Sequence, residues 1–264
     1  MKKQQIILSL VGVLAVVLIY QLPRVVVENE TNTNIEPKKE AHDFSITPED
    51  QDVFSSLTQL LKGELEIKKS VNFADSLAKL HLKYQQVDSA SLYAGYILEV
   101  DSGRESLQKA ASLYYRAFQL SPNADQAAEL AVLARGALEQ LLVDDPQNNM
   151  LKNKLAMTLM TTENPMAGIQ MLREVLADDP ENREATLNLG LLAIRSGQYD
   201  RAKERFQALL DKDSTDSEAT LYYGVSLMET GDQEEARRFF EKIINQTDVD
   251  PAIKATASSF IEEL

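Results

Sequence analysis

Residues 149–250 read NMLKNKLAMTLMTTENPMAGIQMLREVLADDPEN (149–182), REATLNLGLLAIRSGQYDRAKERFQALLDKDSTD (183–216) and SEATLYYGVSLMETGDQEEARRFFEKIINQTDVD (217–250). Aligned, these three lines repeat one pattern every 34 residues. Small residues recur at positions 8 and 20, and large apolar residues recur at positions 7, 24 and 28. The recurring residues are Leu155, Leu189 and Tyr223; Ala156, Gly190 and Gly224; Gly168, Ala202 and Ala236; Leu172, Phe206 and Phe240; Leu176, Leu210 and Ile244.

The spacing within one copy predicts two helices. Positions 4, 7, 8 and 11 lie on one face of a first helix, and positions 20, 24, 27 and 28 lie on one face of a second. Positions 8 and 20 are small because two antiparallel helices cross closest there. Gly197 and Gly231 stand at position 15, where a left-handed C-terminal cap favours glycine. Helix starts are predicted at Asn164-Pro165 and at Asp232, which has capping-box spacing to Glu235.

The period and residue types resemble the tetratricopeptide repeat (TPR) family, whose unit is a helix–turn–helix of 34 residues. The resemblance implies an all-α solenoid, wound as a right-handed superhelix, over residues 47–264. Its repeats would be 71–104, an irregular segment 105–148, then 149–182, 183–216 and 217–250. Residues 251–264 would form a capping helix that covers the last exposed core, with Asp250 as N-cap and Pro251 at N1.

The N-terminal half matches this frame less well. Residues 71–104 place Leu77 and Ala78 at positions 7 and 8, but lack helix signals at the turn. Residues 105–148 fit two frames, and we interpret them as a longer helix pair, 105–120 and 125–143. A first helix starts at Thr47-Pro48 and carries Val53, Phe54, Leu57, Leu60 and Leu61 at helical spacing. It would act as an N-terminal cap or, alternatively, as a dimerisation helix.

The N-terminus combines a basic stretch, 1–5, with an uncharged apolar run, 6–22. Seventeen helical residues span about 25 Å, near the lower limit for a hydrocarbon core of roughly 30 Å. An uncleaved transmembrane anchor and a cleaved signal peptide both fit; the missing Ala-x-Ala site favours the anchor. Residues 23–46 form a polar linker. The positive-inside rule places the N-terminus in the cytoplasm and the repeats in the periplasm or outside, on a single-pass inner (plasma) membrane protein.

Composition argues against several functions. The net charge of −14, from 41 acidic and 27 basic residues, disfavours nucleic-acid binding. The chain has no cysteine and two histidines. His42 lies in the polar linker and is expected to be solvated, and His81 takes a packing position. No catalytic or phosphate-binding motif is present. We therefore expect no enzyme activity, catalytic residue, metal, cofactor or small-molecule substrate.

In the family's frame, positions 2, 5, 9, 12 and 13 of the first helices face the concave surface. The partner-binding residues that this implies are Met157, Met160, Leu187, Leu191, Ile194, Arg195, Leu221, Val225 and Met228. The family's carboxylate clamp needs lysine, arginine and asparagine at such places, and this mainly apolar set departs from it. An apolar or amphipathic helix of a partner protein fits better. Alternatively, the same side chains pack between adjacent repeats.

Together these features predict a non-catalytic, membrane-anchored scaffold or chaperone-like adaptor of the cell envelope. The layout resembles that of the membrane-anchored TPR proteins of cytochrome c maturation and of the ancillary TPR subunit of the Sec translocon. The alternative is a permanent structural subunit of an envelope assembly or secretion complex.

Overall fold

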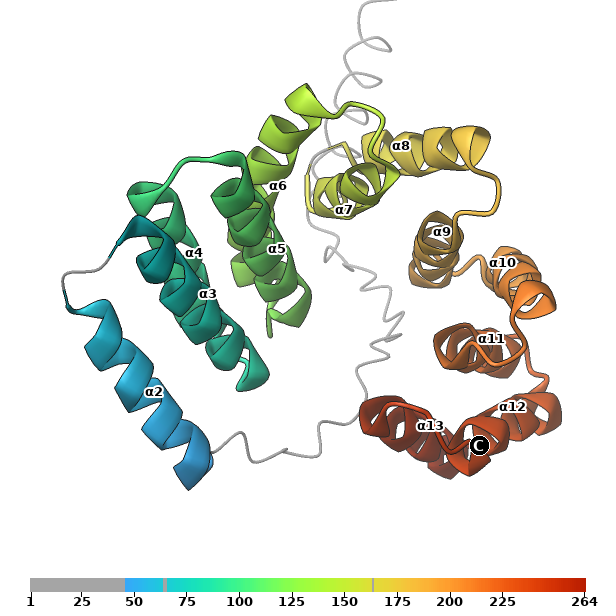
Figure 1. The fold of residues 1–264 in the computed structure, drawn as a ribbon. Helices are drawn as coiled ribbons and strands as arrows, with labels where there is room; N and C mark the ends of the chain where they lie inside the picture. Colours follow the sequence, from blue (N-terminus) through green and yellow to red (C-terminus); the bar gives the residue numbers. More distant parts are fainter. Residues whose placement is uncertain (1–45, 64–65, 163) are drawn as a thin grey trace, which may run out of the picture. The chain divides into compact units, whose positions relative to one another are not determined.

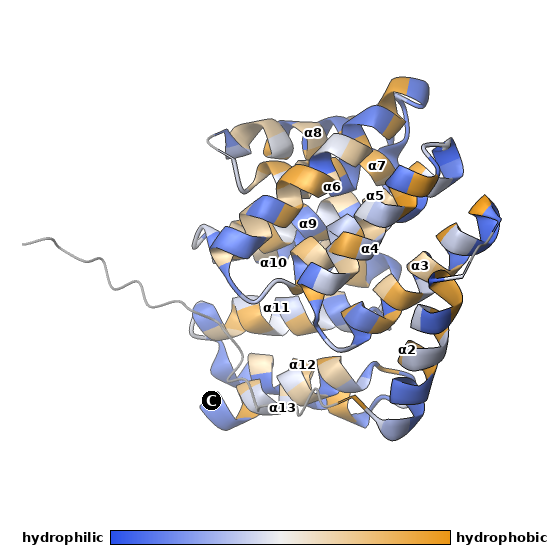
Figure 2. Cartoon of the chain, turned by 90° about the vertical axis from the view of Figure 1, so that its left-hand side faces the viewer, coloured by the Kyte–Doolittle hydropathy of each residue, from blue (hydrophilic) through white to orange (hydrophobic). Residues whose placement is uncertain are grey.

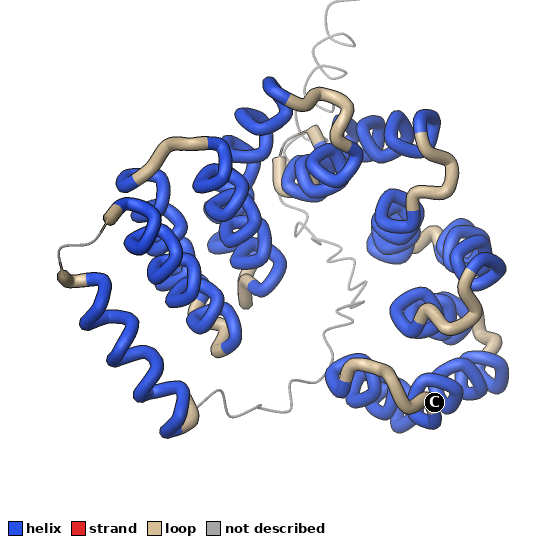
Figure 3. The backbone as a smooth tube through the Cα atoms, in the orientation of Figure 1, coloured by secondary structure: helices blue, strands red, loops and turns tan. Residues whose placement is uncertain are grey.

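The computed structural model describes residues 46–63, 66–162 and 164–264, and these residues form twelve helices joined by loops (Figures 1 and 3). No strand occurs in the described ranges. The helices are α2 (Pro48–Leu61), α3 (Ile67–Lys83), α4 (Val87–Val100), α5 (Arg104–Leu120), α6 (Ala124–Asp144), α7 (Asn149–Leu159), α8 (Pro165–Asp178), α9 (Arg183–Arg195), α10 (Tyr199–Lys212), α11 (Ser217–Glu229), α12 (Gln233–Asn245) and α13 (Pro251–Glu263). The predicted all-helical solenoid is thus observed.

Each helix from α2 to α13 packs against the next one along the chain. Among odd-numbered helices, α3 also contacts α5, α7 contacts α9, α9 contacts α11, and α11 contacts α13. No even-numbered pair of the described helices shows comparable packing, so the odd-numbered helices form the inner layer of the stack. The inner layer has one interruption, because α5 and α7 lack the packing seen between the other inner neighbours.

The interruption coincides with the segment where the 34-residue frame fails. The helices α5 and α6 lie within one residue of the predicted pair 105–120 and 125–143. With 21 residues, α6 is longer than any other described helix. This longest described helix connects α5 to α7, the two inner helices that lack mutual packing.

The core explains the residue sizes at positions 8 and 24. The Phe206 and Phe240 rings are fully buried. A Cβ atom added to Gly190 would lie 2.6 Å from the Phe206 ring, and one added to Gly224 would lie 2.6 Å from the Phe240 ring. In the first copy the smaller Leu172 takes position 24, and position 8 is alanine. Each glycine therefore makes room for a phenylalanine.

The turns within repeats use left-handed caps. Gly197 and Gly231 have φ of +69° and +90°, as predicted for position 15. After α9, the N–H of Gln198 donates to the Ala193 carbonyl at 2.8 Å and that of Gly197 to the Ile194 carbonyl at 2.9 Å, a Schellman motif. Gln85 occupies position 15 of residues 71–104 and makes the same turn with φ of +53°. No glycine marks this turn in the sequence.

Replacing Gln85 with glycine should raise the free energy of unfolding by about 0.5–1 kcal/mol. A non-glycine residue in this region costs roughly 1–2 kcal/mol, part of which glycine gives back as unfolded-chain entropy. Urea denaturation followed by circular dichroism would measure the gain. The matched reverse variant, Gly231→Gln, should lose a similar amount, because nothing lies within 4 Å of its added Cβ. Equal stability of both variants and the wild type would contradict this explanation.

The inner helices begin with side-chain caps at the repeat period. Asn148, Asn182 and Asp216 each accept a hydrogen bond from the backbone N–H three residues ahead. Asp250 caps α13 in front of Pro251, as predicted. The predicted capping box at Asp232 is wrong: its backbone N–H closes the Schellman turn onto the Leu227 carbonyl, and its carboxylate lies 3.3 Å from the Thr230 hydroxyl. Asn164 likewise precedes Pro165 without a side-chain cap bond.

The first described helix packs on α3, as expected of a cap. Thr47 caps α2, and Asp50 accepts hydrogen bonds from Tyr84 and, at 2.6 Å, from Lys83. The Phe54 ring lies 4.7 Å from that of His81, which is partly buried as predicted. No α2 residue is fully buried, and whether this helix also dimerises stays an open prediction.

The predicted anchor 6–22 and all but the last residue of the linker 23–46 lie outside the described residues. Of the helices described, none has both the length and the apolar character needed to cross a membrane. Figure 2 shows hydrophilic and hydrophobic residues mixed along each labelled helix, in keeping with helices that bury one face.

Candidate functional site

A cavity of about 580 Å³ opens on the inner layer, and we call it the large cavity. It lies where α5 and α7 are spaced apart, and α9 and α11 complete its wall. Its volume falls within the range of ordinary ligand pockets, roughly 300–1,000 Å³. The lining residues are Tyr115, Phe118, Gln119, Met157, Arg183, Glu184, Leu187, Asn188, Leu191 and Glu218.

Half of these lining residues are apolar or aromatic. Tyr115 and Leu187 are mostly buried and anchor the wall to the core, whereas Phe118, Met157 and Leu191 are half-buried. Burial raises the pKa of the Tyr115 phenol, with a further contribution from Glu184, so the phenol is neutral at physiological pH. The wall thus offers apolar surface together with a neutral hydroxyl.

Asn188 contributes a polar group without a partner. Its side chain is 7% exposed and lines the large cavity, yet its Nδ2 has no hydrogen-bond partner among the described residues. Most buried polar atoms in folded proteins are hydrogen-bonded, and one left unpaired costs about 1–3 kcal/mol. The Nδ2 atom is shielded from solvent, so a bound segment would reach it only after the side chain turned toward the large cavity.

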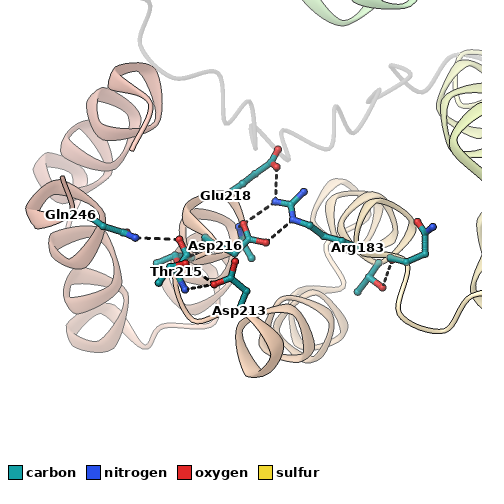
Figure 4. Close-up of polar contacts among 10 residues, drawn as sticks. Arg183, Asp213, Thr215, Asp216, Glu218 and Gln246 are labelled. Atoms are coloured by element: carbon teal, nitrogen blue, oxygen red, sulfur yellow. Dashed lines mark hydrogen bonds and ion pairs between the residues drawn. The ribbon is translucent and has the colours of Figure 1, made fainter. Parts of the chain in front are cut away.

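The charged edge of the large cavity is held by an ion pair that joins two repeats (Figure 4). Arg183 at the start of α9 donates to both carboxylate oxygens of Asp216, over 2.7 and 2.8 Å, and to Glu218 over 3.0 Å. Asp216 also caps α11, and its side chain is only 7% exposed. Burial raises the pKa of Asp216, but bonds from Arg183 and the Ala219 N–H outweigh it and hold the pKa below its usual 3.8.

Comparison with known proteins agrees with the repeat geometry. The tetratricopeptide repeat family model matches residues 153–197 and 187–251. Residues 153–251 therefore carry TPR repeats. Such repeats form solenoids whose concave surfaces bind proteins or peptides. No curated protein sequence matches the chain significantly.

Solved structures include similar TPR folds. A tetratricopeptide repeat protein from Parabacteroides merdae ATCC 43184 has a TM-score of 0.55 and 16% identity, with 81% of each chain covered. MamA has a TM-score of 0.44 and 18% identity, over 69% of this chain and 98% of its own. YrrB, described as a TPR protein with an unusual peptide-binding site, has 0.41 and 20%, over 78% and 98%. The likeness to the Parabacteroides merdae protein shows a shared fold.

Three of the nine predicted partner-binding residues line the large cavity: Met157, Leu187 and Leu191. The other six line no part of it. Leu221 and Val225 are buried, Ile194 and Met228 are half-buried, Arg195 is exposed at the end of α9, and Met160 follows α7 with its methyl group against Gly168. The structure therefore brings together one predicted residue of α7 and two of the four on α9, but none of those on α11.

The expectations drawn from the sequence did not include the α5 wall or Asn188. Tyr115 is buried, and it also lines the large cavity. The TPR frame could not identify Phe118 and Gln119, because it fails over residues 105–148. Asn188 stands at position 6 of its repeat, one residue beyond the predicted groove position. An asparagine in this largely apolar stretch, TLNLGLL, was the available signal.

Replacing Asp216 with asparagine should lower the free energy of unfolding at neutral pH by about 1 kcal/mol, because the cap survives and the charge pair does not. The pKa of Asp216 is lowered on folding, so its stabilisation is present above the unfolded value near 3.8 and is lost as pH falls through the folded value. The difference between wild type and variant should therefore shrink at about pH 3. Urea denaturation at both pH values measures it. Glu218→Gln removes only the more exposed of the two ion pairs of Arg183, and should lower the free energy of unfolding by less. If the stability difference between wild type and Asp216→Asn does not shrink at low pH, the charge explanation is contradicted.

Proposed function

We propose that the protein is a non-catalytic adaptor that holds an apolar or amphipathic segment of a partner protein in the large cavity. The observation that carries this proposal is the large cavity itself, about 580 Å³ on the inner layer, with half of its lining residues apolar or aromatic. The wall of Phe118, Leu187 and Leu191 would bury the apolar side chains of the segment. Each large side chain fully buried contributes about 1.5–3 kcal/mol before the cost of ordering the segment.

The N-terminal sequence supports a location for this activity. Residues 6–22 would anchor the chain in the inner membrane, with residues 1–5 in the cytoplasm and the repeats in the periplasm or outside. The polar residues 23–46 would tether the repeats to the anchor. An anchor and tether raise the local concentration of the adaptor near membrane-associated partners without any additional contact.

Photo-crosslinking in native membranes tests the large cavity. A benzoylphenylalanine placed at Gln119, an exposed lining residue, should capture a defined partner in the full-length protein. The same probe at Leu92, 74% exposed on α4, is the control. Adding Leu191→Glu should abolish capture at position 119, provided that circular dichroism shows the fold intact.

Equal capture from both positions, or capture that survives Leu191→Glu, would contradict the assignment. Gln119→Trp offers a second block that leaves the buried core untouched, and should reduce recovery of the partner. A partner that stays bound in constant proportion through high-salt and detergent washes would instead favour the permanent structural subunit.

The location has its own test. We expect the intact mass of the purified protein to retain residues 1–22, and the repeats to be digested when protease is added to spheroplasts. A mass that lacks the apolar run would identify a cleaved signal peptide. Protection of the repeats in intact spheroplasts would place them in the cytoplasm and overturn the proposed orientation.

A further inference from the structure

A second, smaller cavity of about 310 Å³ lies between α3 and α5, also on inner helices, and we call it the small cavity. Its character differs from that of the large cavity, because most of its lining side chains are polar or charged. The lining residues are Asp75, Lys79, Glu105, Gln108, Lys109, Ser112, Leu113 and Arg116.

Cations outnumber carboxylates around the small cavity. Lys79 pairs with Asp75 at 2.7 Å, and Lys109 pairs with Glu105. Arg116 is exposed and forms no ion pair with any described residue. Lys154 is likewise unpaired among the described residues, and its Nζ lies 5.8 Å from the centre of the Tyr115 ring, beside the large cavity. This end of the inner layer therefore carries a surplus of positive charge in a chain whose net charge is −14.

The two cavities share α5 as their common wall. Ser112 and Arg116 face the small cavity, and Tyr115 and Gln119 face the large one. Residues 112, 116 and 119 follow one another at spacings of four and three, so they lie along one face of the helix. A single extended or helical segment that crosses α5 would therefore contact both cavities.

The wall of the large cavity on α9 and α11 is acidic. Glu184 and Glu218 line it. The one lining cation there, Arg183, is already bound to Asp216 and Glu218. The inner layer thus runs from a cationic part on α3, α5 and α7, through the apolar wall, to an anionic part on α9 and α11.

We propose that the bound segment is bipolar, with acidic residues at one end, apolar residues in the middle and basic residues at the other. This inference rests on the proposed function and adds the chemistry and direction of its ligand. The acidic end would lie over Arg116 and Lys154, the apolar residues in the large cavity, and the basic end over Glu184 and Glu218. Complementary charges at both ends set register and direction, since the reversed orientation brings like charges together.

Synthetic peptides test this order of charges. Four fluorescein-labelled peptides would share one apolar centre and carry acidic and basic, two acidic, two basic, or two neutral flanks. Fluorescence anisotropy with the full-length protein, kept in detergent, should show the acidic–basic peptide binding about tenfold more tightly than any of the others at low salt. The advantage should fall as ionic strength rises from about 0.05 to about 1 M, where the screening length is near 3 Å.

Substitutions at one end at a time sharpen the test. Arg116→Glu with Lys154→Glu should make the peptide with two basic flanks the preferred ligand. Glu184→Lys with Glu218→Lys should make the peptide with two acidic flanks preferred. Arg238→Glu and Glu241→Lys change the same charges at exposed positions of α12, on the outer layer, and should leave the wild-type order unchanged.

The outcomes separate the two proposals. If all four peptides bind equally well, or if the α12 variants shift the preference as much as the inner variants, the bipolar ligand is overturned while peptide binding stands. If none binds, including the neutral one, the large cavity is not a peptide site and the inference fails with it. Light scattering tests for self-association. If the molar mass of the protein rises with its concentration, and Arg116→Glu abolishes that rise, the surface binds a second copy of the chain, and the proposal of a partner segment is overturned.

Discussion

Replacing Phe240 with alanine should lower the free energy of unfolding by about 3–5 kcal/mol, the usual cost of emptying a buried aromatic site. The ring is fully buried and fits against Gly224, whose missing Cβ provides its space. It also stacks on Phe260 of α13 at 5.3 Å, so its loss removes one of the contacts between α12 and the capping helix. Urea denaturation followed by circular dichroism would measure the loss, and hydrogen exchange should show reduced protection in α13.

The neighbouring aromatic residue is a matched control. Phe239 is half-buried and meets Tyr223 edge-on at 4.8 Å. Phe239→Ala therefore removes a similar volume at a site open to solvent, and should cost only about 1–2 kcal/mol, with α13 protected as in the wild type. Similar losses for the two variants would mean that α12 buries its aromatic residues differently from the arrangement described.

The repeated half of the fold was predictable because the sizes of the residues at positions 8 and 24 indicate how the two helices of each copy pack. Gly190 with Phe206, and Gly224 with Phe240, state from sequence alone which helix faces meet. The left-handed turns were equally visible at Gly197, but not at Gln85, where an ordinary residue adopts the same φ because the surrounding Schellman hydrogen bonds determine it. The sequence predicts a left-handed turn only where a glycine occupies the residue with positive φ.

The helix starts contain a signal that the sequence held and the interpretation missed. Asn148, Asn182, Asp216 and Asp250 recur every 34 residues, and all four cap the helix that follows. By contrast, Asp232 has the right spacing to Glu235 but no cap bond. The recurrence of a residue type at the repeat period was therefore a better predictor than a local motif, because a fixed position in a solenoid has a fixed environment.

The candidate site was less predictable for a physical reason. Positions within a repeat specify which residues face the inner layer, but the large cavity exists because α5 and α7 are spaced apart. That spacing occurs next to the long α6, in the segment where the period fails. Met157 and Leu191 could thus be placed on the inner layer from the repeat frame, whereas their opposition to Tyr115 could not. In this solenoid the large cavity lies beside the irregular segment, so the repeat pattern alone does not predict its position.

Replacing Gly190 with alanine should cost about 1–3 kcal/mol, since the new methyl group would lie 2.6 Å from the buried Phe206 ring. Gly136→Ala is the control: it is an exposed glycine of α6 with nothing within 4 Å of its added Cβ, so helix propensity should make it stabilising by about 0.5–1 kcal/mol. The opposite signs would separate the steric effect at Gly190 from a general effect of glycine in helices.

The first repeat indicates how the Gly190 defect can be relieved. In residues 149–182, Ala156 stands at position 8 and Leu172 at position 24. Gly190→Ala with Phe206→Leu would recreate this pair in residues 183–216. Each single change should destabilise, by overpacking or by a cavity, whereas the double variant should recover part of the loss, with a coupling energy of about 0.5–3 kcal/mol. A double-mutant cycle by urea denaturation measures it. Additive losses would mean that the two positions do not constrain each other. A favourable coupling would show that, within each repeat, the size of the residue at position 8 determines which size is tolerated at position 24.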